Sequence, residues 1–149
     1  MRAVIQRVLK SSVSVDGNVI GEIGKGYNIL LGVCNEDTEK DADKLIRKII
    51  GLRICEDENG KTNLSIQDTD GEMLIISQFT LYADCRKGRR PSFIQAGNPE
   101  HAKKLYEYFI EQCRPEVRKT AHGEFGADMK VEIINDGPFT IVLDSKDLA

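Results

Sequence analysis

Hydrophobic and polar positions near the start of the chain follow a strand pattern. Residues 3–8 and 11–15 alternate or carry β-branched side chains, and the turn sequence at 16–18 precedes a further strand-like run at 19–23. This pattern predicts a β-hairpin or a meander. Residues 27–33 are almost continuously apolar, which is typical of a strand that is buried on both faces.

Two later segments have helical periodicity. Thr38 begins a capping box with Asp41, and Asn98 is a predicted N-cap that is followed by Pro99 at the first helical position. Pro115 ends the second helix. The apolar positions that share one face of the first helix are Ala42, Leu45, Ile46, Ile49 and Ile50. The corresponding positions of the second are Ala102, Leu105, Tyr106, Phe109, Ile110 and Cys113.

The middle of the chain contains weaker signals. Residues 52–55 predict a short strand that is closed by an Asn-Gly turn at 59–60, and the polar stretch 61–71 predicts a loop. Residues 73–82 are mostly apolar and predict a long central strand. A loop with two glycines and a proline is expected over 84–97.

The end of the chain predicts two more strands, at 130–134 and 139–143, joined by a tight Asn-Asp-Gly-Pro turn. Strands therefore cluster at both ends, with two amphipathic helices between them. This order predicts an α+β fold in which residues 1–149 form a single domain with a curved, mainly antiparallel, barrel-like sheet. The glycines at 21, 24 and 26 precede a strand instead of opening a helix, which disfavours a dinucleotide-binding fold.

Composition narrows the classes of partner. The 149 residues include 21 Lys and Arg against 24 Asp and Glu, so the net charge is −3 and no general basic field is available to bind nucleic acid. Any contact with nucleic acid must be local. No apolar run approaches the length of a membrane span, and the first residues do not resemble a signal peptide. We therefore expect a soluble, cytoplasmic protein.

The cysteines and histidines offer little conventional chemistry. The four cysteines, at 34, 55, 85 and 113, are too far apart for a compact zinc site, so we expect no metal or other cofactor. Cys34, Cys55 and Cys113 occupy apolar patterns and are interpreted as core residues. His101 is expected on a solvated first turn of the second helix, and His122 in a loop. An enzyme with this inventory would use positioning and backbone hydrogen bonds.

Two neighbouring segments stand out. Ser77, Gln78 and Thr80 interrupt the apolar central strand just before the loop, and buried polar side chains are costly unless they are satisfied. They either line a site or bond to nearby backbone and solvent. The loop then has a cluster of cations, which is either a phosphate site or a solvated charge run, consisting of Arg86, Lys87, Arg89 and Arg90. The flanking Tyr82 and Phe93 either stack on a base or belong to the core.

Several of these segments together resemble the D-aminoacyl-tRNA deacylase family, also called the D-tyrosyl-tRNA deacylase family. The resemblance runs from Met1 to about Leu143. The motifs that carry it are Val4-Ile5-Gln6-Arg7-Val8, Gly21-Glu22-Ile23-Gly24, Ser77-Gln78-Phe79-Thr80, Arg90-Pro91-Ser92-Phe93, Gly126-Ala127-Asp128-Met129, and Asn135-Asp136-Gly137-Pro138 with Thr140.

The resemblance implies a homodimeric editing enzyme that hydrolyses the ester of D-aminoacyl-tRNA and of glycine mischarged on alanine tRNA, while rejecting L-aminoacyl-tRNA. Gly137-Pro138 would be a cis dipeptide that enters the partner's pocket and excludes an L side chain. Phe139 stands where the family commonly has valine. The residues implied to bind the aminoacyl group and the terminal adenosine are Ser77, Gln78, Phe79, Thr80, Phe125, Met129, Asn135, Gly137 and Pro138.

The resemblance leaves two routes for catalysis, which it places at Gln78, Phe79 and Thr80. Thr80 acts as a nucleophile, or the vicinal ribose hydroxyl of the tRNA assists the reaction. We favour the tRNA-assisted route because no base for Thr80 is evident in the sequence, while amide donors near Phe79 and Thr80 can stabilise an oxyanion. The competing interpretations are a noncatalytic RNA-end binding module that uses Arg86 to Arg90, and a structural dimerisation domain.

Overall fold

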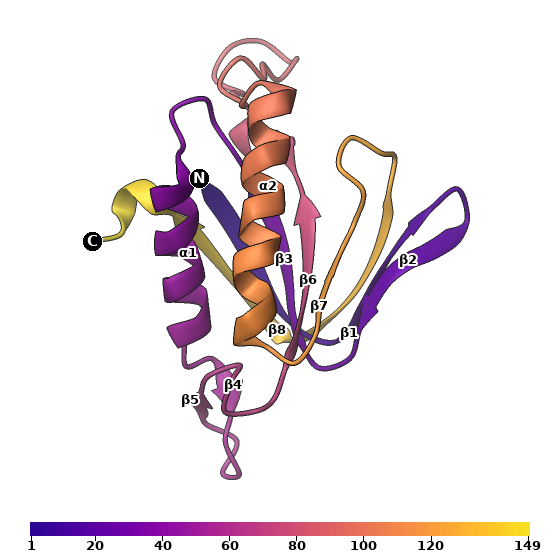
Figure 1. Ribbon diagram of the computed structural model, residues 1–149, viewed down its shortest axis with the longest axis vertical. Helices are drawn as coiled ribbons and strands as arrows, with labels where there is room; N and C mark the ends of the chain where they lie inside the picture. Colours follow the sequence, from indigo (N-terminus) through magenta and orange to yellow (C-terminus); the bar gives the residue numbers. More distant parts are fainter.

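Two helices lie over one face of a curved sheet in the computed structural model, which describes residues 1–149 (Figure 1). The helices are α1 (Glu39–Gly51) and α2 (Pro99–Cys113), and the 3-10 helices are η1 (Phe79–Tyr82), η2 (Arg114–Glu116) and η3 (Ser145–Asp147). The strands are β1 (Arg2–Val15), β2 (Asn18–Ile23), β3 (Gly26–Gly32), β4 (Cys55–Glu56), β5 (Thr62–Leu64), β6 (Glu72–Ser77), β7 (Thr120–His122) and β8 (Lys130–Asp144).

The main sheet has the order β2-β1-β3-β6-β7, and β8 pairs with β1. β1 is antiparallel to β2, β3 and β8, whereas the β3–β6 and β6–β7 pairs are parallel. The sheet curls until β2 approaches β7, where a Cβ added to Gly21 would lie 2.8 Å from the carbonyl oxygen of His122. The predicted α+β fold with a curved, barrel-like, mainly antiparallel sheet and two amphipathic helices is confirmed.

The pairing register defines two ends of the sheet. At one end Ala3 pairs with Leu31, which pairs with Ser77 of β6. At the other end Val8 pairs with both Gly26 of β3 and Asn135 of β8. The two rows are five residues apart, or about 16 Å along the strands. Ser77 and Asn135 therefore lie at opposite ends of the sheet.

The prediction of two strands about a tight turn at 135–138 was wrong. β8 is one strand that runs antiparallel to β1 on both sides of this segment, so the chain does not reverse direction. Between the pairs Val8–Asn135 and Gln6–Thr140, β1 has one residue and β8 has four. These four residues, 136–139, bulge away from β1 and are called the bulge here. Pro138 has no N–H to give to a ladder, and a bulge is a place where proline is tolerated.

The prediction of a strand over 73–82 was also wrong in its second half. β6 ends at Ser77, and Phe79 to Tyr82 form η1. The chain folds back over Gly32 of β3, where an added Cβ would lie 3.1 Å from the Gln78 carbonyl oxygen and 3.0 Å from Leu81 Cβ. This close approach to a glycine redirects residues whose apolar character alone suits a strand.

Smaller differences concern the boundaries of short elements. Segments 3–8 and 11–15 belong to one uninterrupted strand, β1, which is long enough to pair with three neighbours. The short strand expected at 52–55 begins only at Cys55, because its partner β5 reaches no further. That partner lies within 61–71, which was expected to be entirely loop. His122 lies in β7 instead of a loop, since Thr120 to His122 pair with β6.

Both helices begin where their caps predict. The Asp41 carboxylate accepts a hydrogen bond from the Thr38 N–H at 2.9 Å, and the Asn98 side chain accepts one from the Glu100 N–H at 3.0 Å. The apolar faces of α1 and α2 are buried as expected, except that Ile50 is only partly buried.

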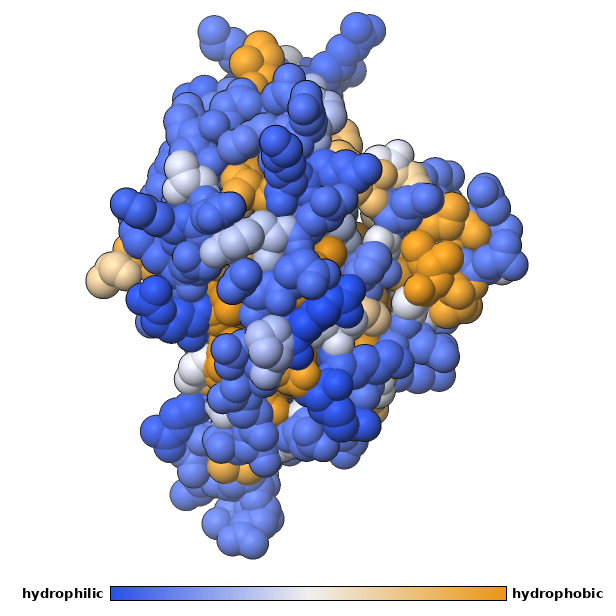
Figure 2. Space-filling model, in the orientation of Figure 1, coloured by the Kyte–Doolittle hydropathy of each residue, from blue (hydrophilic) through white to orange (hydrophobic).

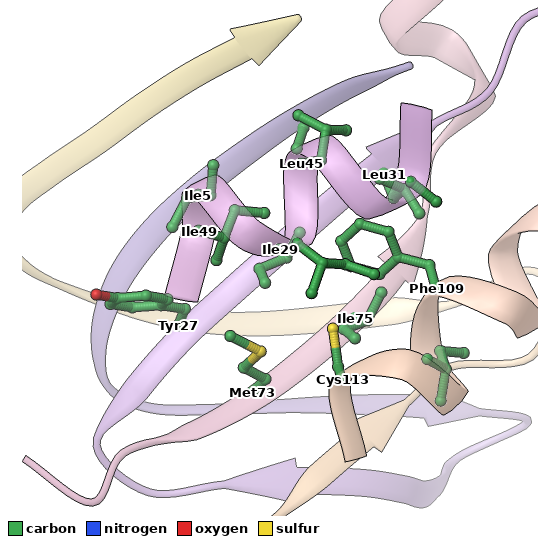
Figure 3. Close-up of a cluster of buried hydrophobic side chains, with 14 of the residues drawn as sticks. Ile5, Tyr27, Ile29, Leu31, Leu45, Ile49, Met73, Ile75, Phe109 and Cys113 are labelled. Atoms are coloured by element: carbon green, nitrogen blue, oxygen red, sulfur yellow. The ribbon is translucent and has the colours of Figure 1, made fainter. Parts of the chain in front are cut away.

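The helices and the sheet enclose the larger of two hydrophobic clusters. Tyr27, Ile29 and Leu31 of β3 meet Leu45 of α1 and Phe109 of α2 there (Figure 3). The opposite face of the sheet buries a smaller cluster, which contains Val8, Val13, Ile23, Leu74 and Ile76. Since both faces are covered, β3 is apolar almost throughout, as the continuous pattern predicted.

The outer surface over α2 is mostly hydrophilic (Figure 2). An apolar group stands out on the hairpin of β1 and β2, where Val19 and Ile20 are 57% and 46% exposed. Neither helix is both long and apolar enough to cross a membrane.

Candidate active site

A cavity of about 780 Å³ opens where β6 ends. Its walls come from the ends of β3 and β6, the loop that precedes α2, the first turn of α2, and residues 125–131. Most of the lining is apolar and the rest is polar, as is usual for small-ligand sites. Of the residues that the sequence nominated, those that line it are Ser77, Gln78, Phe79, Phe125 and Met129.

The backbone at the mouth of this cavity has unused donors. The Gln78 N–H donates to the Leu31 carbonyl at 2.8 Å, which continues the sheet by one residue. The first hydrogen bond of η1 then runs from the Leu81 N–H to the Gln78 carbonyl. The N–H groups of Phe79 and Thr80 consequently have no partner within η1. They are available to an oxygen atom of a bound molecule.

Thr80 lies beside the cavity but does not line it. Its hydroxyl accepts a hydrogen bond from the Gln78 side-chain amide at 2.5 Å, and no carboxylate or imidazole bonds to it. A threonine needs an adjacent base to become a nucleophile. Since the amide is a donor and not a base, the arrangement orients the hydroxyl without activating it.

Aromatic rings form one wall of the cavity. Phe79 and Phe93 pack edge to face with ring centroids 5.0 Å apart, and they are 54% and 37% exposed. Phe125 lies 6.0 Å from the Tyr106 ring. Tyr106 is buried and donates to the Ile75 carbonyl at 2.7 Å, and burial raises the pKa of its phenol. The exposed Phe79–Phe93 pair is the part of this wall that can receive a base or another flat group.

Tyr82 belongs to the core and is not a stacking surface. The Arg2 guanidinium lies 4.4 Å from the centre of the Tyr82 ring and donates to the Leu81 carbonyl at 2.9 Å. Its Nε donates to the Asp144 carboxylate at 3.0 Å. Arg2 thus joins η1 to the end of β8. Sequence reasoning missed this residue because its partners are far away along the chain.

The segment around Gly137 lies outside the cavity of its own chain. It occupies the bulge of β8, at the end of the sheet opposite to Ser77, and Gly137 and Pro138 are exposed. The peptide bond between them is cis. The Asn135 side chain bonds to the Phe139 N–H at 2.8 Å and to the Thr140 hydroxyl at 3.0 Å, which braces the bulge.

Arg7 supports the same bulge from beneath. It is 7% exposed, its Nε donates to the Asp136 carbonyl at 3.1 Å, and its Nη1 donates to the Ile54 carbonyl at 2.8 Å. Its guanidinium also lies 4.7 Å from the centre of the Phe139 ring. Phe139 therefore packs on a cation.

Residues 86–90, called the cationic loop here, follow η1 along the chain, and their side chains are exposed. Arg86 pairs with Asp84 at 2.7 Å, and this partner lowers the pKa of the Asp84 carboxyl to about 2. Lys87, Arg89 and Arg90 form no ion pair within 4 Å. Three of the four nominated charges are thus free to contact a phosphate.

The histidines lie outside the cavity. His122 is exposed, and its Nδ1 lies 2.7 Å from the Gly123 carbonyl oxygen. His101 is partly buried and its Nε2 is shielded from solvent without a hydrogen-bond partner, so the expectation of a solvated ring was wrong. No group of three or more His, Cys, Asp or Glu side chains is arranged to hold a metal ion.

Comparisons with known proteins converge on one family. The model of the family described as D-Tyr-tRNA(Tyr) deacylase matches residues 4–144. A protein of Clostridium botulinum (strain Loch Maree / Type A3) named D-aminoacyl-tRNA deacylase is 64% identical over 146 residues, or 98% of each chain. Its namesake in Clostridium novyi (strain NT) is 60% identical over the same share of both chains.

Two solved structures share the fold. One, titled c-Myc DNA Unwinding Element Binding Protein, has a TM-score of 0.91 and 46% identity, with 97% of this chain and 98% of that chain covered. The other, described as a probable eukaryotic D-amino acid tRNA deacylase, has a TM-score of 0.84 and 17% identity, with 96% and 98% covered.

Proposed function

This chain belongs to the D-Tyr-tRNA(Tyr) deacylase family and is a hydrolase, and we propose that it removes D-amino acids from tRNA as a cytoplasmic homodimer. Its substrates are D-aminoacyl-tRNA and glycine mischarged on alanine tRNA. L-aminoacyl-tRNA is rejected. The observation that carries the proposal is the cavity at the end of β6, which Ser77, Gln78 and Phe79 line and beside which the N–H groups of Phe79 and Thr80 have no partner within η1.

The cavity suits an aminoacyl ester of a terminal adenosine. Its volume of about 780 Å³ lies within the range that small-ligand pockets occupy. Phe125 and Met129 supply an apolar wall for the side chain of the amino acid. The exposed edge-to-face pair of Phe79 and Phe93 offers a surface for the adenine base.

A second copy of the chain completes the site. Gly137 and Pro138 lie at the opposite end of the sheet from Ser77, so they cannot reach the cavity of their own chain. They are exposed, and Arg7 and Asn135 hold the bulge in place. In the homodimer this bulge enters the other subunit's cavity, where its main chain occupies the space that an L side chain needs. Glycine has no side chain and passes.

Catalysis depends on positioning and on the tRNA itself. The N–H groups of Phe79 and Thr80 bind the oxyanion that develops when water attacks the ester carbonyl. One donor of this kind contributes about 3 kcal/mol, near a hundredfold in rate. The ribose hydroxyl next to the ester assists the attack or the departure of the ribose oxygen. Thr80 is not the nucleophile, because its only side-chain partner is the Gln78 amide.

Matched D- and L-aminoacyl-tRNA substrates test the activity. We expect release of the free D-amino acid and of glycine, with little release of the L-amino acid. Tight binding of both substrates without turnover would instead support an RNA-end binding module. Absence of both binding and turnover would leave only a structural dimerisation domain.

Two changes separate the catalytic routes. We expect Thr80→Ala and Gln78→Ala to retain measurable deacylation, while replacing the neighbouring ribose hydroxyl by hydrogen slows the reaction more. Single-turnover rates on saturated enzyme make the comparison independent of binding. Loss of all activity in a folded Thr80→Ala protein, together with full activity on the deoxy substrate, would contradict tRNA assistance.

The cationic loop provides part of the affinity for the tRNA. Lys87, Arg89 and Arg90 contact phosphate, and Arg86 does so in competition with Asp84. Replacing all four cations by glutamine should reduce the slope of log affinity for tRNA against log salt concentration by about 0.9 for each lost contact. The preference for D- over L-aminoacyl-tRNA should be unchanged. An unaltered slope would make this loop a solvated surface.

A further inference from the structure

A second basic surface lies far along the chain from the cationic loop. The C-terminal half of α1, residues 52–53 and residues 148–149 surround a groove of about 390 Å³. Four cations line it, and no aspartate or glutamate side chain does. The four, called the groove cations here, are Lys44, Arg47, Lys48 and Arg53.

The groove cations form no close ion pair, although the Asp68 carboxyl, whose pKa is lowered mainly by hydrogen bonds from Ser65, also feels the charge of Arg53. None of them forms an ion pair within 4 Å, although the protein carries a net negative charge. Arg53 donates to the Asn63 carbonyl at 2.8 Å and to the Asn63 side chain, so its guanidinium is held in place by neutral groups. Four unpaired cations repel each other, and a polyanion relieves that repulsion.

The groove is joined to the bulge of β8 through Arg7. Arg53 immediately precedes Ile54, whose carbonyl accepts from Arg7 Nη1 at 2.8 Å, while Arg7 Nε donates to Asp136 beside Gly137. The groove and the bulge are therefore neighbours. Figure 1 shows the β4–β5 hairpin at the bottom of the molecule with the end of α1 just above it, whereas the loop before α2 lies at the top.

We propose that the groove cations bind the phosphate backbone of the tRNA whose aminoacyl end lies in the other subunit's cavity. This inference rests on the proposed function, in which the bulge enters that cavity. Since the groove accompanies the bulge, it borders the mouth of the other subunit's site. Each tRNA then contacts the cationic loop of the subunit that cleaves it and the groove of the partner.

The first test measures binding as a function of salt. Replacing the groove cations by glutamine should reduce the slope of log affinity against log salt concentration by about 0.9 per lost contact. The control variant carries the same change in charge elsewhere, at Lys10, Lys25, Lys104 and Lys119, which are exposed. It should leave the slope within about one unit of the unmodified protein. A slope that is equal in the groove variant and the control overturns the proposal.

The second test asks which subunit's groove serves which cavity. Ala96→Trp fills the cavity, since Ala96 lines it, and heterodimers are purified with two different tags. In the first heterodimer, one subunit carries both Ala96→Trp and the groove substitutions, and its partner is unmodified. In the second heterodimer, one subunit carries Ala96→Trp and its partner carries the groove substitutions. If the groove acts across the dimer, the first heterodimer binds and cleaves tRNA poorly and the second keeps one complete site. The reverse order, or a monomeric protein, overturns the proposal.

The two proposals fail in different ways. D-aminoacyl-tRNA hydrolysis by the unmodified protein is measured first, and its absence contradicts the proposed function itself. Normal hydrolysis together with an unchanged salt slope in the groove variant contradicts only the role of the groove.

Discussion

Replacing Arg7 by alanine tests how the bulge of β8 is held. The guanidinium is almost fully buried and bonds two carbonyls, those of Ile54 and Asp136, while packing on the Phe139 ring. No other side chain replaces these contacts. Truncation therefore leaves the buried Ile54 carbonyl and the partly buried Asp136 carbonyl without their partner, and it leaves an empty space beneath the bulge.

The expected loss of stability follows from these contacts. A hydrogen bond to a charged group contributes about 1.5–3 kcal/mol, and the cation over an aromatic ring adds about 0.5–2 kcal/mol. Arg7 also forms ion pairs with the carboxylates of Glu56 and Asp136, at 3.5 and 3.6 Å. Both carboxylates are about half exposed, so these pairs add little to the stability. These contributions share one side chain and do not add fully, so we expect Arg7→Ala to lower the free energy of unfolding by about 3–5 kcal/mol. Arg7→Lys keeps the charge and one bond, and it should lose about half as much.

Urea denaturation followed by circular dichroism measures the loss. Arg114→Ala is the matched control, because Arg114 pairs with Glu111 at 2.9 Å on the surface and should lose less than about 1 kcal/mol. In the folded Arg7→Lys protein, a loosened bulge should also raise cleavage of L-aminoacyl-tRNA relative to D. A loss below about 1 kcal/mol in Arg7→Ala would refute the reasoning from these contacts.

Three further predictions concern other parts of the chain. The pKa of Asp84 is lowered on folding to about 2, so its stabilising contact with Arg86 is present above its ordinary pKa near 3.8 and is lost as the pH falls towards 2; NMR titration should show a higher midpoint in Arg86→Ala. Burial raises the pKa of Cys113 to about 12, so a thiol reagent at pH 8 should modify the exposed Cys85 rapidly and Cys113 not at all. Asn98→Ala should cost about 1 kcal/mol in the unfolding free energy, and Asn98→Asp should restore most of it.

Local signals in the sequence were sufficient for the helices and for the central strand β3. The caps at Thr38 and Asn98 act on backbone groups within three residues, so the chain carries all the information that places these helix starts. The continuous apolar run of β3 likewise reports burial on both faces. These features depend on neighbours along the chain or on the hydrophobicity of one segment.

The errors arose where a distant strand decided the conformation. The Asn-Asp-Gly-Pro sequence has the composition of a hairpin turn, yet β1 is long enough to pair with both flanking segments, and residues 136–139 become a bulge. The segment after Ser77 is apolar enough for a strand, yet β3 offers no further pairing beyond it and the chain folds over Gly32. Propensity and turn composition do not record which partner is within reach.

The candidate site shows the same division. The sequence by itself determined the polar segment from Ser77 to Thr80, the cluster of cations after it and the family to which these motifs belong. Only the tertiary structure placed Ser77 and Gly137 at opposite ends of one sheet, buried Tyr82 under Arg2 and gathered four cations of α1 and its neighbours into a groove. The physical reason is that a cavity, a buried cation or a charged groove is made by residues from separate segments, and their distances are set by strand register and packing, which no single segment encodes.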